Sequence, residues 1–468
     1  MYSSTAHVSA ARAVIIAALL FGSADPLAAE VRPCTAHHHC DMSAREFCMT
    51  GRCRAADDHE LRTLFAFGVG PFYDLTGNGS ARDMSQRAPA LIREMLSRTG
   101  AFRTLPASAG EQSALAEGWK ASSIAFDAWT ARGAFALIKG TFRATRRGLL
   151  LELHTYDVET GTRIRTPSDR MLITDNSFQR ALELWTNAVV DHFTGRPGVL
   201  GTRIVFARRP REPRTNKRIA VMDLASGEEF AITDGKKLSV LPSWGPGSHD
   251  VAYTGYQDGN PDLFLGDQKF AGFPNLNMGA EWNQDGSLCA ISLSKDGNSE
   301  IYLLDGTSGA VIRRLTSHSA IDSSPSWSPD GKRIAFVSDR SGSPQVHVMN
   351  IWGGNIRRVT QGHGYATSPA WSPHGNEIVY NAMMEGGRFD LFIINEQSRR
   401  VRRLTSGGGS NEDPSWSPDG RQIVFSSARK DRTGKTSRQL YILGARGGTP
   451  KKISGGKVDY FTPSWSTR

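Results

Sequence analysis

One phrase recurs along the second half of the chain and constrains the fold more than any other feature. A tryptophan, usually preceded by Pro-Ser and followed by a turn sequence such as Ser-Pro-Asp-Gly, occurs six times at intervals of 38 to 49 residues. The tryptophans in this context are Trp244, Trp282, Trp327, Trp371, Trp416 and Trp465. About 40–45 residues per repeat is typical of a four-stranded propeller blade. The repeat therefore predicts a ring of blades.

The repeat that begins at Ser324 contains every expected part of one blade. "PSW" predicts a short first strand, and Ser-Pro-Asp-Gly predicts a turn with Pro at its second position and Gly at its fourth. "KRIAFVS", "PQVHVMN" and "IRRVT" predict the other three strands. Apolar residues at consecutive positions, as in "IAFV", indicate strands that are covered on both faces. Blades stacked around an axis provide that cover, with the tryptophans between neighbours.

The two ends of the repeat region predict how the ring closes. The first block of strands begins near Arg203 without a tryptophan phrase before it, and only three residues follow Trp465. We therefore expect the C-terminal phrase to supply the first strand of the first blade. Residues 199–468 then form an all-β, six-bladed β-propeller with no open strand edge.

An α/β domain is predicted ahead of the ring, over residues 61–197. "LRTLFAFGVG" predicts a strand, and "AFALIKGTFRA" with "GLLLELHTYDV" predicts a hairpin. Residues 80–100 and 177–195 have apolar side chains at helical spacing, and the two helices should stop at Gly100 and Gly195. The second helix is expected to bury Leu182, Trp185, Val189 and Phe193.

The first 29 residues predict a signal peptide. Arg12 precedes the apolar run 13–21, and small residues follow in "GSADPLAAE". The run is too short for a permanent membrane span. We expect an exported, periplasmic protein without a membrane span.

Four of the five cysteines lie within twenty residues of one another and predict a small knuckle over residues 34–53. In an oxidising compartment Cys34, Cys40, Cys48 and Cys53 would form two disulfides, for which three connectivities exist and the interlaced one is favoured. A zinc site with the histidines at 37–39 is the alternative, but their spacing differs from that of usual zinc ligands. Cys289 is expected to be a buried thiol in an apolar strand.

The order of these parts resembles the TolB family, the periplasmic component of the Tol-Pal envelope system. The resemblance rests on "SRTGAFRTL", "ALIKGTFRATRRGLLLELHTYDVETG", the run into "GTRIVFA", the "PSWSPDG" phrases and the "RRLT" blade ends. It implies a non-enzymatic scaffold that binds the outer-membrane lipoprotein Pal over the ring. It also implies TolA as a partner of the N-terminal tail, although the cysteine-rich segment stands here in place of the family's extended tail.

The resemblance also implies where the lipoprotein would bind. The segments just before the tryptophan phrases vary from blade to blade, and variable loops on a repeated frame commonly form binding surfaces. The positions that match the family's contacts, together with their neighbours, are Leu276, Asn277, Met278, Gly279, Ser323, Thr367 and Asn411. Leu276 stands near the place where relatives often have a histidine, and with Met278 it would form an apolar anchor.

Other classes of function have weaker support in the sequence. The chain has no G-x-S-x-G nucleophile motif, and the recurring aspartates of the Ser-Pro-Asp-Gly turns are turn formers, so no catalytic residue, metal ligand or cofactor is assigned. Basic pairs at the blade ends, such as Arg402-Arg403, and a net charge of +10 would suit an anionic envelope polymer or carbohydrate. The same pairs are also typical of protected outer strand edges, which is the favoured interpretation. Nucleic acid is not expected as a partner, and a monomer is.

Overall fold

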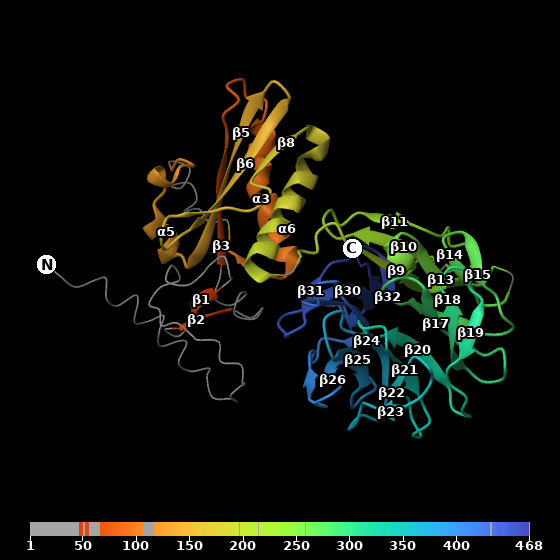
Figure 1. Ribbon diagram of the computed structural model, residues 1–468. Coiled ribbons are helices and arrows are strands. Elements are labelled where there is room, and N and C mark those ends of the chain that lie inside the picture. Colours follow the sequence, from red (N-terminus) through yellow and green to blue (C-terminus); the bar gives the residue numbers. More distant parts are fainter. Residues whose placement is uncertain are drawn as a thin grey trace. The chain divides into compact units, whose positions relative to one another are not determined.

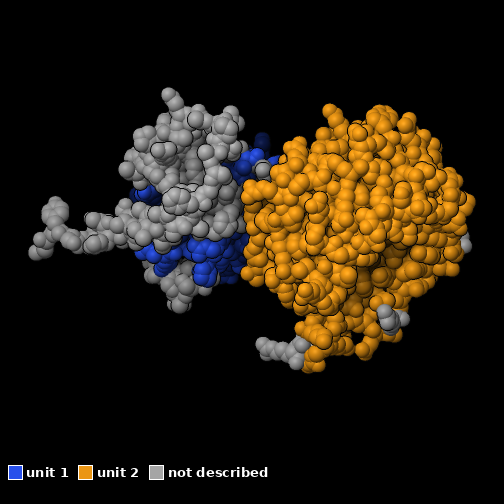
Figure 2. Space-filling view, turned by 90° about the horizontal axis from the view of Figure 1, so that it is seen from below, with its two compact units in different colours: residues 1–198 blue, residues 199–468 orange. Residues whose placement is uncertain are grey.

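The computed structural model describes residues 46–49, 52–55, 66–106, 117–195, 197–213, 215–257, 259–430 and 433–467. The chain divides into two compact units, residues 1–198 and 199–468, which are coloured separately in Figure 2. The predicted signal peptide lies outside the described residues. In the described part of the chain, no helix has both the length and the apolar character needed to cross a membrane.

Only a short hairpin of the cysteine-rich segment is described. Strands β1 (Glu46–Met49) and β2 (Arg52–Ala55) pair antiparallel, and their register sets Cys48 directly opposite Cys53. Cys34 and Cys40 lie outside the described residues, so the two-disulfide knuckle stays a prediction. Cys289 is a free, fully buried cysteine, as expected, and burial raises the pKa of its thiol well above the ordinary value.

The first unit is a mixed sheet covered by helices (Figure 1). Its strand order is β4-β3-β5-β6-β7, with β8 also paired to β6, and β3 runs parallel to β4 and β5. The strands are β3 (Ala66–Asp74), β4 (Arg103–Thr104), β5 (Ala134–Thr145), β6 (Gly148–Asp157), β7 (Arg163–Ile164) and β8 (Arg170–Ile173). The predicted hairpin is β5 with β6.

Two long helices pack side by side in this unit. Helices α3 (Arg82–Thr99) and α6 (Phe178–Thr194) both end at a glycine in the left-handed region, Gly100 with φ 63° and Gly195 with φ 70°, as predicted. The four residues expected on the inner face of α6 are all buried. Phe67 of β3 packs edge to face against Phe193 of α6, and this contact helps to hold the helix on the sheet.

Several shorter helical turns were not predicted. They are α5 (Phe126–Ala131), η3 (Ala121–Ser123), η4 (Asp175–Ser177) and, in the second unit, η5 (Pro246–Ser248). α5 sets Trp129 against the sheet so closely that a Cβ on Gly68 of β3 would lie 2.8 Å from the indole. Glycine is therefore required at that strand position.

The second unit is a ring of six four-stranded antiparallel sheets (Figure 1). Blade one is β32 (Val458–Trp465), β9 (Arg203–Pro210), β10 (Arg218–Asp223) and β11 (Glu229–Ala231). Blade two is β12 (Ser239–Trp244), β13 (Val251–Gly255), β14 (Asp262–Leu265) and β15 (Gln268–Ala271). Blade three is β16 (Asn277–Trp282), β17 (Leu288–Leu293), β18 (Glu300–Asp305) and β19 (Val311–Arg314).

The other three blades repeat this pattern. Blade four is β20 (Asp322–Trp327), β21 (Arg333–Ser338), β22 (Gln345–Asn350) and β23 (Arg357–Arg358). Blade five is β24 (Ala366–Trp371), β25 (Glu377–Met383), β26 (Phe389–Asn395) and β27 (Val401–Arg403). Blade six is β28 (Ser410–Trp416), β29 (Gln422–Lys430), β30 (Thr436–Gly444) and β31 (Lys451–Lys452).

The ring closes as the sequence predicted. β32, at the C-terminal end, pairs antiparallel with β9, so the end of the chain supplies the first strand of blade one. Each phrase tryptophan is at most 8% exposed and packs into the core shared with the preceding blade. Trp327 of blade four, for example, lies among Ala290, Ile301 and Leu303 of blade three, and its Nε1 donates to the Glu281 carbonyl at 2.9 Å.

One expectation about the first strands was wrong. They are not the short "PSW" segments but run for six to eight residues, and each has a register shift shortly before the tryptophan. Met278, Gly279, Ser323 and Thr367 therefore lie within strands rather than in loops. The bulge interrupts the alternation of side chains, which hid the first half of each strand in the sequence pattern.

Candidate partner-binding surface

The two ends of the ring differ in what they expose. Antiparallel order within each blade places the connections between blades and the turns between second and third strands at one end, which we call the mouth. The turns that follow the tryptophans, with those between third and fourth strands, lie at the opposite end. The predicted partner-binding residues all belong to the mouth half of the first strands or to the connections that enter them.

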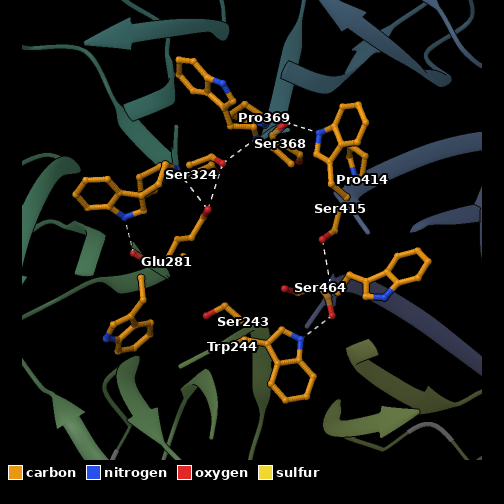
Figure 3. A pocket seen from close by; sticks show the side chains of 18 of the residues that line it. Ser243, Trp244, Glu281, Ser324, Ser368, Pro369, Pro414, Ser415 and Ser464 are labelled. Carbon is orange, nitrogen blue, oxygen red and sulfur yellow. Dashed lines mark hydrogen bonds between the residues drawn. The ribbon is translucent and has the colours of Figure 1, made fainter. Parts of the chain in front are cut away.

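A cavity of about 770 Å³, which we call the channel, lies at the centre of the ring and is lined by the first strands of all six blades (Figure 3). The third residue before each tryptophan has a positive φ and belongs to its wall. These residues are Leu241, Gly279, Ser324, Ser368, Asp413 and Thr462, with φ between 44° and 65°. Only one of them is a glycine. A non-glycine residue in this region costs about 1–3 kcal/mol of conformational strain, and such residues are concentrated at functional sites.

In three blades the residue before the tryptophan accepts the backbone N–H of the next blade's tryptophan along the channel wall: Glu281, Ser326 and Ser415. Ser326 Oγ accepts a hydrogen bond from the backbone N–H of Trp371 at 3.0 Å. In blade three a glutamate takes this place: Glu281 Oε1 accepts the N–H of Trp327 and the hydroxyl of Ser326, each at 3.3 Å (Figure 3). Burial raises the pKa of Glu281 to about 7, and the two hydrogen bonds only partly offset that shift.

A second carboxylate lines the channel in blade six. Asp413 Oδ1 accepts the hydroxyl of Ser368 at 3.2 Å. Burial raises the pKa of Asp413, the neighbouring Glu412 raises it further, and Arg438 acts in the opposite direction. In the part of the chain that the structure describes, no group of three or more His, Cys, Asp or Glu residues could hold a metal ion.

The structure brings most of the predicted contact residues to the mouth of the channel. Leu276, Met278, Gly279 and Ser323 line it, and all four are partly accessible. Met278, Ser323 and Thr367 occupy the same place in successive blades, four residues before the tryptophan. Thr367 is also partly accessible, and its Oγ1 accepts the amide of Asn381 at 2.9 Å.

Asn277 and Asn411 do not belong to this accessible set, since both are completely buried. The Asn277 amide donates to the Phe273 carbonyl at 2.7 Å, and its Oδ1 accepts the Phe273 N–H at 2.9 Å. The Asn411 amide donates to Asp390 at 3.0 Å. Both side chains are buried and hydrogen-bonded within the protein, so they position the mouth segments, and their part in partner binding stays a prediction.

Two further features of the mouth were not singled out from the sequence. Ile321, in the connection that enters blade four, is 55% exposed, and its backbone N–H is held by Asp339 at 2.8 Å. Phe461 occupies in blade one the place of Met278 in blade three. The sequence does contain a signal for Phe461, because this residue lies four residues before a phrase tryptophan, as Met278 does.

The blade-end basic pairs are used mainly within the ring. The second arginine of three pairs donates its Nε to the carbonyl of a threonine two residues later, at 2.6 to 2.9 Å. These contacts join Arg314 to Thr316, Arg358 to Thr360 and Arg403 to Thr405. Arg357 pairs with Glu396, and Arg402 donates to the Ala445 carbonyl of the next blade at 2.6 Å. The arginines of these pairs therefore mainly stabilise the blades.

Comparison with known proteins agrees with this architecture. The family model of the TolB amino-terminal domain matches residues 62–164. The model of the TolB beta propeller domain matches residues 190–389 and 361–468, more than half of the chain. The chain belongs to the TolB family.

Relatives and solved structures of the TolB family extend the comparison. The "Tol-Pal system protein TolB" of Anaeromyxobacter dehalogenans strain 2CP-1 is 34% identical over 257 residues, which are 54% of this chain and 57% of the relative. The protein of the same name from Anaeromyxobacter sp. strain K is 32% identical over the same length. The crystal structure of TolB from Acinetobacter baumannii has a TM-score of 0.73 at 21% identity and covers 87% of this chain and 97% of that one, so it shares the fold. The match thus spans little more than half the length of the curated relatives.

Proposed function

We propose that this TolB-family protein is a non-enzymatic periplasmic scaffold of the Tol-Pal type. Its mouth would bind a Pal-like outer-membrane lipoprotein and so contribute to envelope integrity and cell division. Family membership and the relatives named as Tol-Pal system proteins support the class of function. TolA remains a candidate second partner through the segment ahead of the α/β domain.

The observation behind the binding site is an apolar group on the solvent-facing mouth. Leu276 and Met278 are partly accessible, and Ile321 exposes more than half of its surface. Apolar side chains exposed together commonly mark a protein-binding site. Ser323 follows Ile321 by two residues and lies on β20, within a frame fixed by the inter-blade tryptophans. Such a surface needs little rearrangement on binding.

The runner-up function is binding of an anionic envelope polymer or carbohydrate. The ion pairs of Arg314 with Glu300 and of Arg403 with Asp390 count against it, because these two charges are already balanced within the blades. Retention of the purified protein on peptidoglycan or lipopolysaccharide, in the absence of any lipoprotein, would favour this alternative.

The test uses the Pal-like domain encoded in the same genome and a double variant, Ser323→Glu with Thr367→Glu. Two carboxylates buried without partners in the interface should weaken binding by about 100-fold or more. Calorimetric titration measures the affinity. The melting temperature should change little, because both side chains are partly accessible and a glutamate at position 367 can still accept the Asn381 amide.

A matched control adds the same charge elsewhere. Gln268→Glu with Gln397→Glu changes two exposed residues at the opposite end of the blades and should leave binding intact. Undiminished binding by the mouth variant, or failure of the wild type to bind any Pal-like domain of its genome, would contradict the proposed function.

A further inference from the structure

Three cationic side chains gather around one aromatic ring in the blade-one sector of the mouth. The ammonium of Lys217 lies 3.9 Å from the centroid of the Phe461 ring. The guanidinium carbons of Arg209 and Arg438 each lie 5.6 Å from the same centroid. The three cations come from separate segments: the end of β9, the turn before β10, and the start of β30. Folding therefore assembles the cluster, which is not visible as a sequence motif.

The charges in this cluster are only partly balanced. Arg438 forms an ion pair with Glu412 at 3.0 Å and also donates to Ser426. In the described part of the chain, no hydrogen bond or ion pair to another side chain involves the Lys217 ammonium or the Arg209 guanidinium. Like charges held this close disfavour one another unless an anion joins them.

The protonation of Lys217 reflects the same imbalance. Burial lowers the pKa of Lys217, and the charges of Arg209 and Arg438 lower it further, while Asp413 acts in the opposite direction. An incoming carboxylate would favour the charged lysine and form charge-assisted hydrogen bonds with it.

The position of the cluster connects it with the predicted contact residues. Phe461 lies four residues before Trp465, as Met278 lies before Trp282. The ring of such positions around the mouth also includes Ser323 and Thr367. A partner seated on the apolar residues of blades three and four would meet the cationic cluster on the other side of the same surface.

We propose that Lys217 and Arg209, held over Phe461, bind a carboxylate side chain that the protein partner presents to the mouth. This inference rests on the proposed function and specifies the chemistry of the partner's contact. Glu412 and Asp413 stand close to the cations and would repel a polymer that carries charges in a row. A single carboxylate, in contrast, can approach Lys217 and Arg209 from the side away from the Phe461 ring, whose negative face holds the two cations.

The first experiment measures the affinity of wild type and Lys217→Met for the Pal-like domain at about 50 mM and about 300 mM salt. Methionine keeps the aliphatic contact with Phe461 and removes the charge. We expect about tenfold weaker binding at low salt and a smaller loss of affinity between the two salt concentrations. Lys217→Arg should retain most of the affinity, since a cation remains over the ring.

The matched control is Lys332→Met, which removes an exposed lysine from a turn at the opposite end of blade four. It should bind as the wild type does, and the melting temperatures of all variants should agree. Equal affinity and equal salt dependence of Lys217→Met and the wild type would overturn the inference but leave the proposed function intact.

A second measurement does not depend on the partner domain. A short peptide with one carboxylate, N-acetyl-Gly-Glu-Gly amide, is added to the full chain, and the rate of amine acylation is followed at each lysine by mass spectrometry. The peptide should protect Lys217 and leave the rate at Lys332 unchanged. If the wild type binds no Pal-like domain, the proposed function fails, and the peptide experiment alone tests the inference. Equal acylation rates at Lys217 with and without the peptide would overturn the inference.

Discussion

The residue before the phrase tryptophan shows how a single substitution alters one blade of a repeated structure. Four blades have a serine there, one has an alanine, and blade three has Glu281: the others are Ser243, Ser326, Ala370, Ser415 and Ser464. The glutamate keeps the inter-blade contact by accepting the N–H of Trp327. It also introduces a carboxylate into a wall where burial disfavours its charge.

We predict that Glu281→Gln stabilises the protein at alkaline pH. The pKa of Glu281 is about 7 in the folded protein and near its ordinary value of 4.5 when unfolded. The wild type should therefore lose stability as the pH rises from about 4.5 to about 7, by about 1–3 kcal/mol, and glutamine should abolish this loss. Glutamine can still accept the N–H of Trp327. Denaturant unfolding near pH 4.5 and pH 8 measures the effect.

The control for this prediction is Glu385→Gln, an exposed glutamate on blade five. It should change the pH dependence of the unfolding free energy very little. A Glu281→Gln protein that is less stable than the wild type at pH 8 would show that the carboxylate is favourable where it lies.

At the scale of the element, the ends of blades one, three, four, five and six contain a recurring hydrogen-bond unit, in which a threonine or serine hydroxyl accepts a backbone N–H of the third strand. In blade five, Thr405 Oγ1 accepts the N–H of Leu391 at 2.9 Å and donates to Asp390 Oδ1 at 2.8 Å. Thr360 accepts the N–H of Val346 in the same way in blade four. The hydroxyl thus continues the pairing between third and fourth strands after the fourth strand has ended. This explains the "RRLT" ending without reference to a ligand.

We predict that Thr405→Val destabilises the propeller by about 1–3 kcal/mol, because the buried N–H of Leu391 and the Asp390 carboxylate both lose a partner. Thr405→Ser keeps the hydroxyl and should cost less than about 1 kcal/mol. Urea unfolding followed by tryptophan fluorescence measures both values. Equal losses in the two variants would mean that the methyl group, and not the hydroxyl, supports the blade end.

The first strands of the blades differ most from what the sequence predicts. The phrase "SPSWSPDG" correctly predicted the tryptophan, the turn and the second strand, because these depend on local pattern. It did not predict that Ser323 is a strand residue, because Ser324 has a positive φ without being a glycine and lies in the register shift between Ser323 and Ser326. Asn277 likewise belongs to a segment that varies from blade to blade, and yet it begins β16 and its amide is buried and donates to the Phe273 carbonyl. Contacts between distant segments, such as Lys217 with Phe461, have no local pattern at all.

At the scale of the ring, the last strand holds the two ends of the propeller together. β32 pairs with β9 from Val458 to Trp465, with one register shift. The Trp465 Nε1 donates to Thr202 Oγ1 at 2.8 Å, and the indole of Trp465 packs with Val424 and Leu440 of blade six. Without this strand, β9 would present an unpaired edge, and such edges invite association with other chains.

We predict that the contribution of closure can be separated from that of the tryptophan. Trp465→Ala should lower the free energy of unfolding of the propeller by about 3–5 kcal/mol, as expected for a large aromatic removed from a core. Trp352→Ala is the matched control: this tryptophan is 65% exposed, and its loss should cost less than about 0.5 kcal/mol. Deleting residues 461–468 removes Trp465 and three of the six residue pairs with β9, so it should cost more than Trp465→Ala and produce concentration-dependent association in sedimentation velocity. If the deletion is no more destabilising than Trp465→Ala and the protein stays monomeric, pairing between the two ends of the propeller adds nothing to its stability.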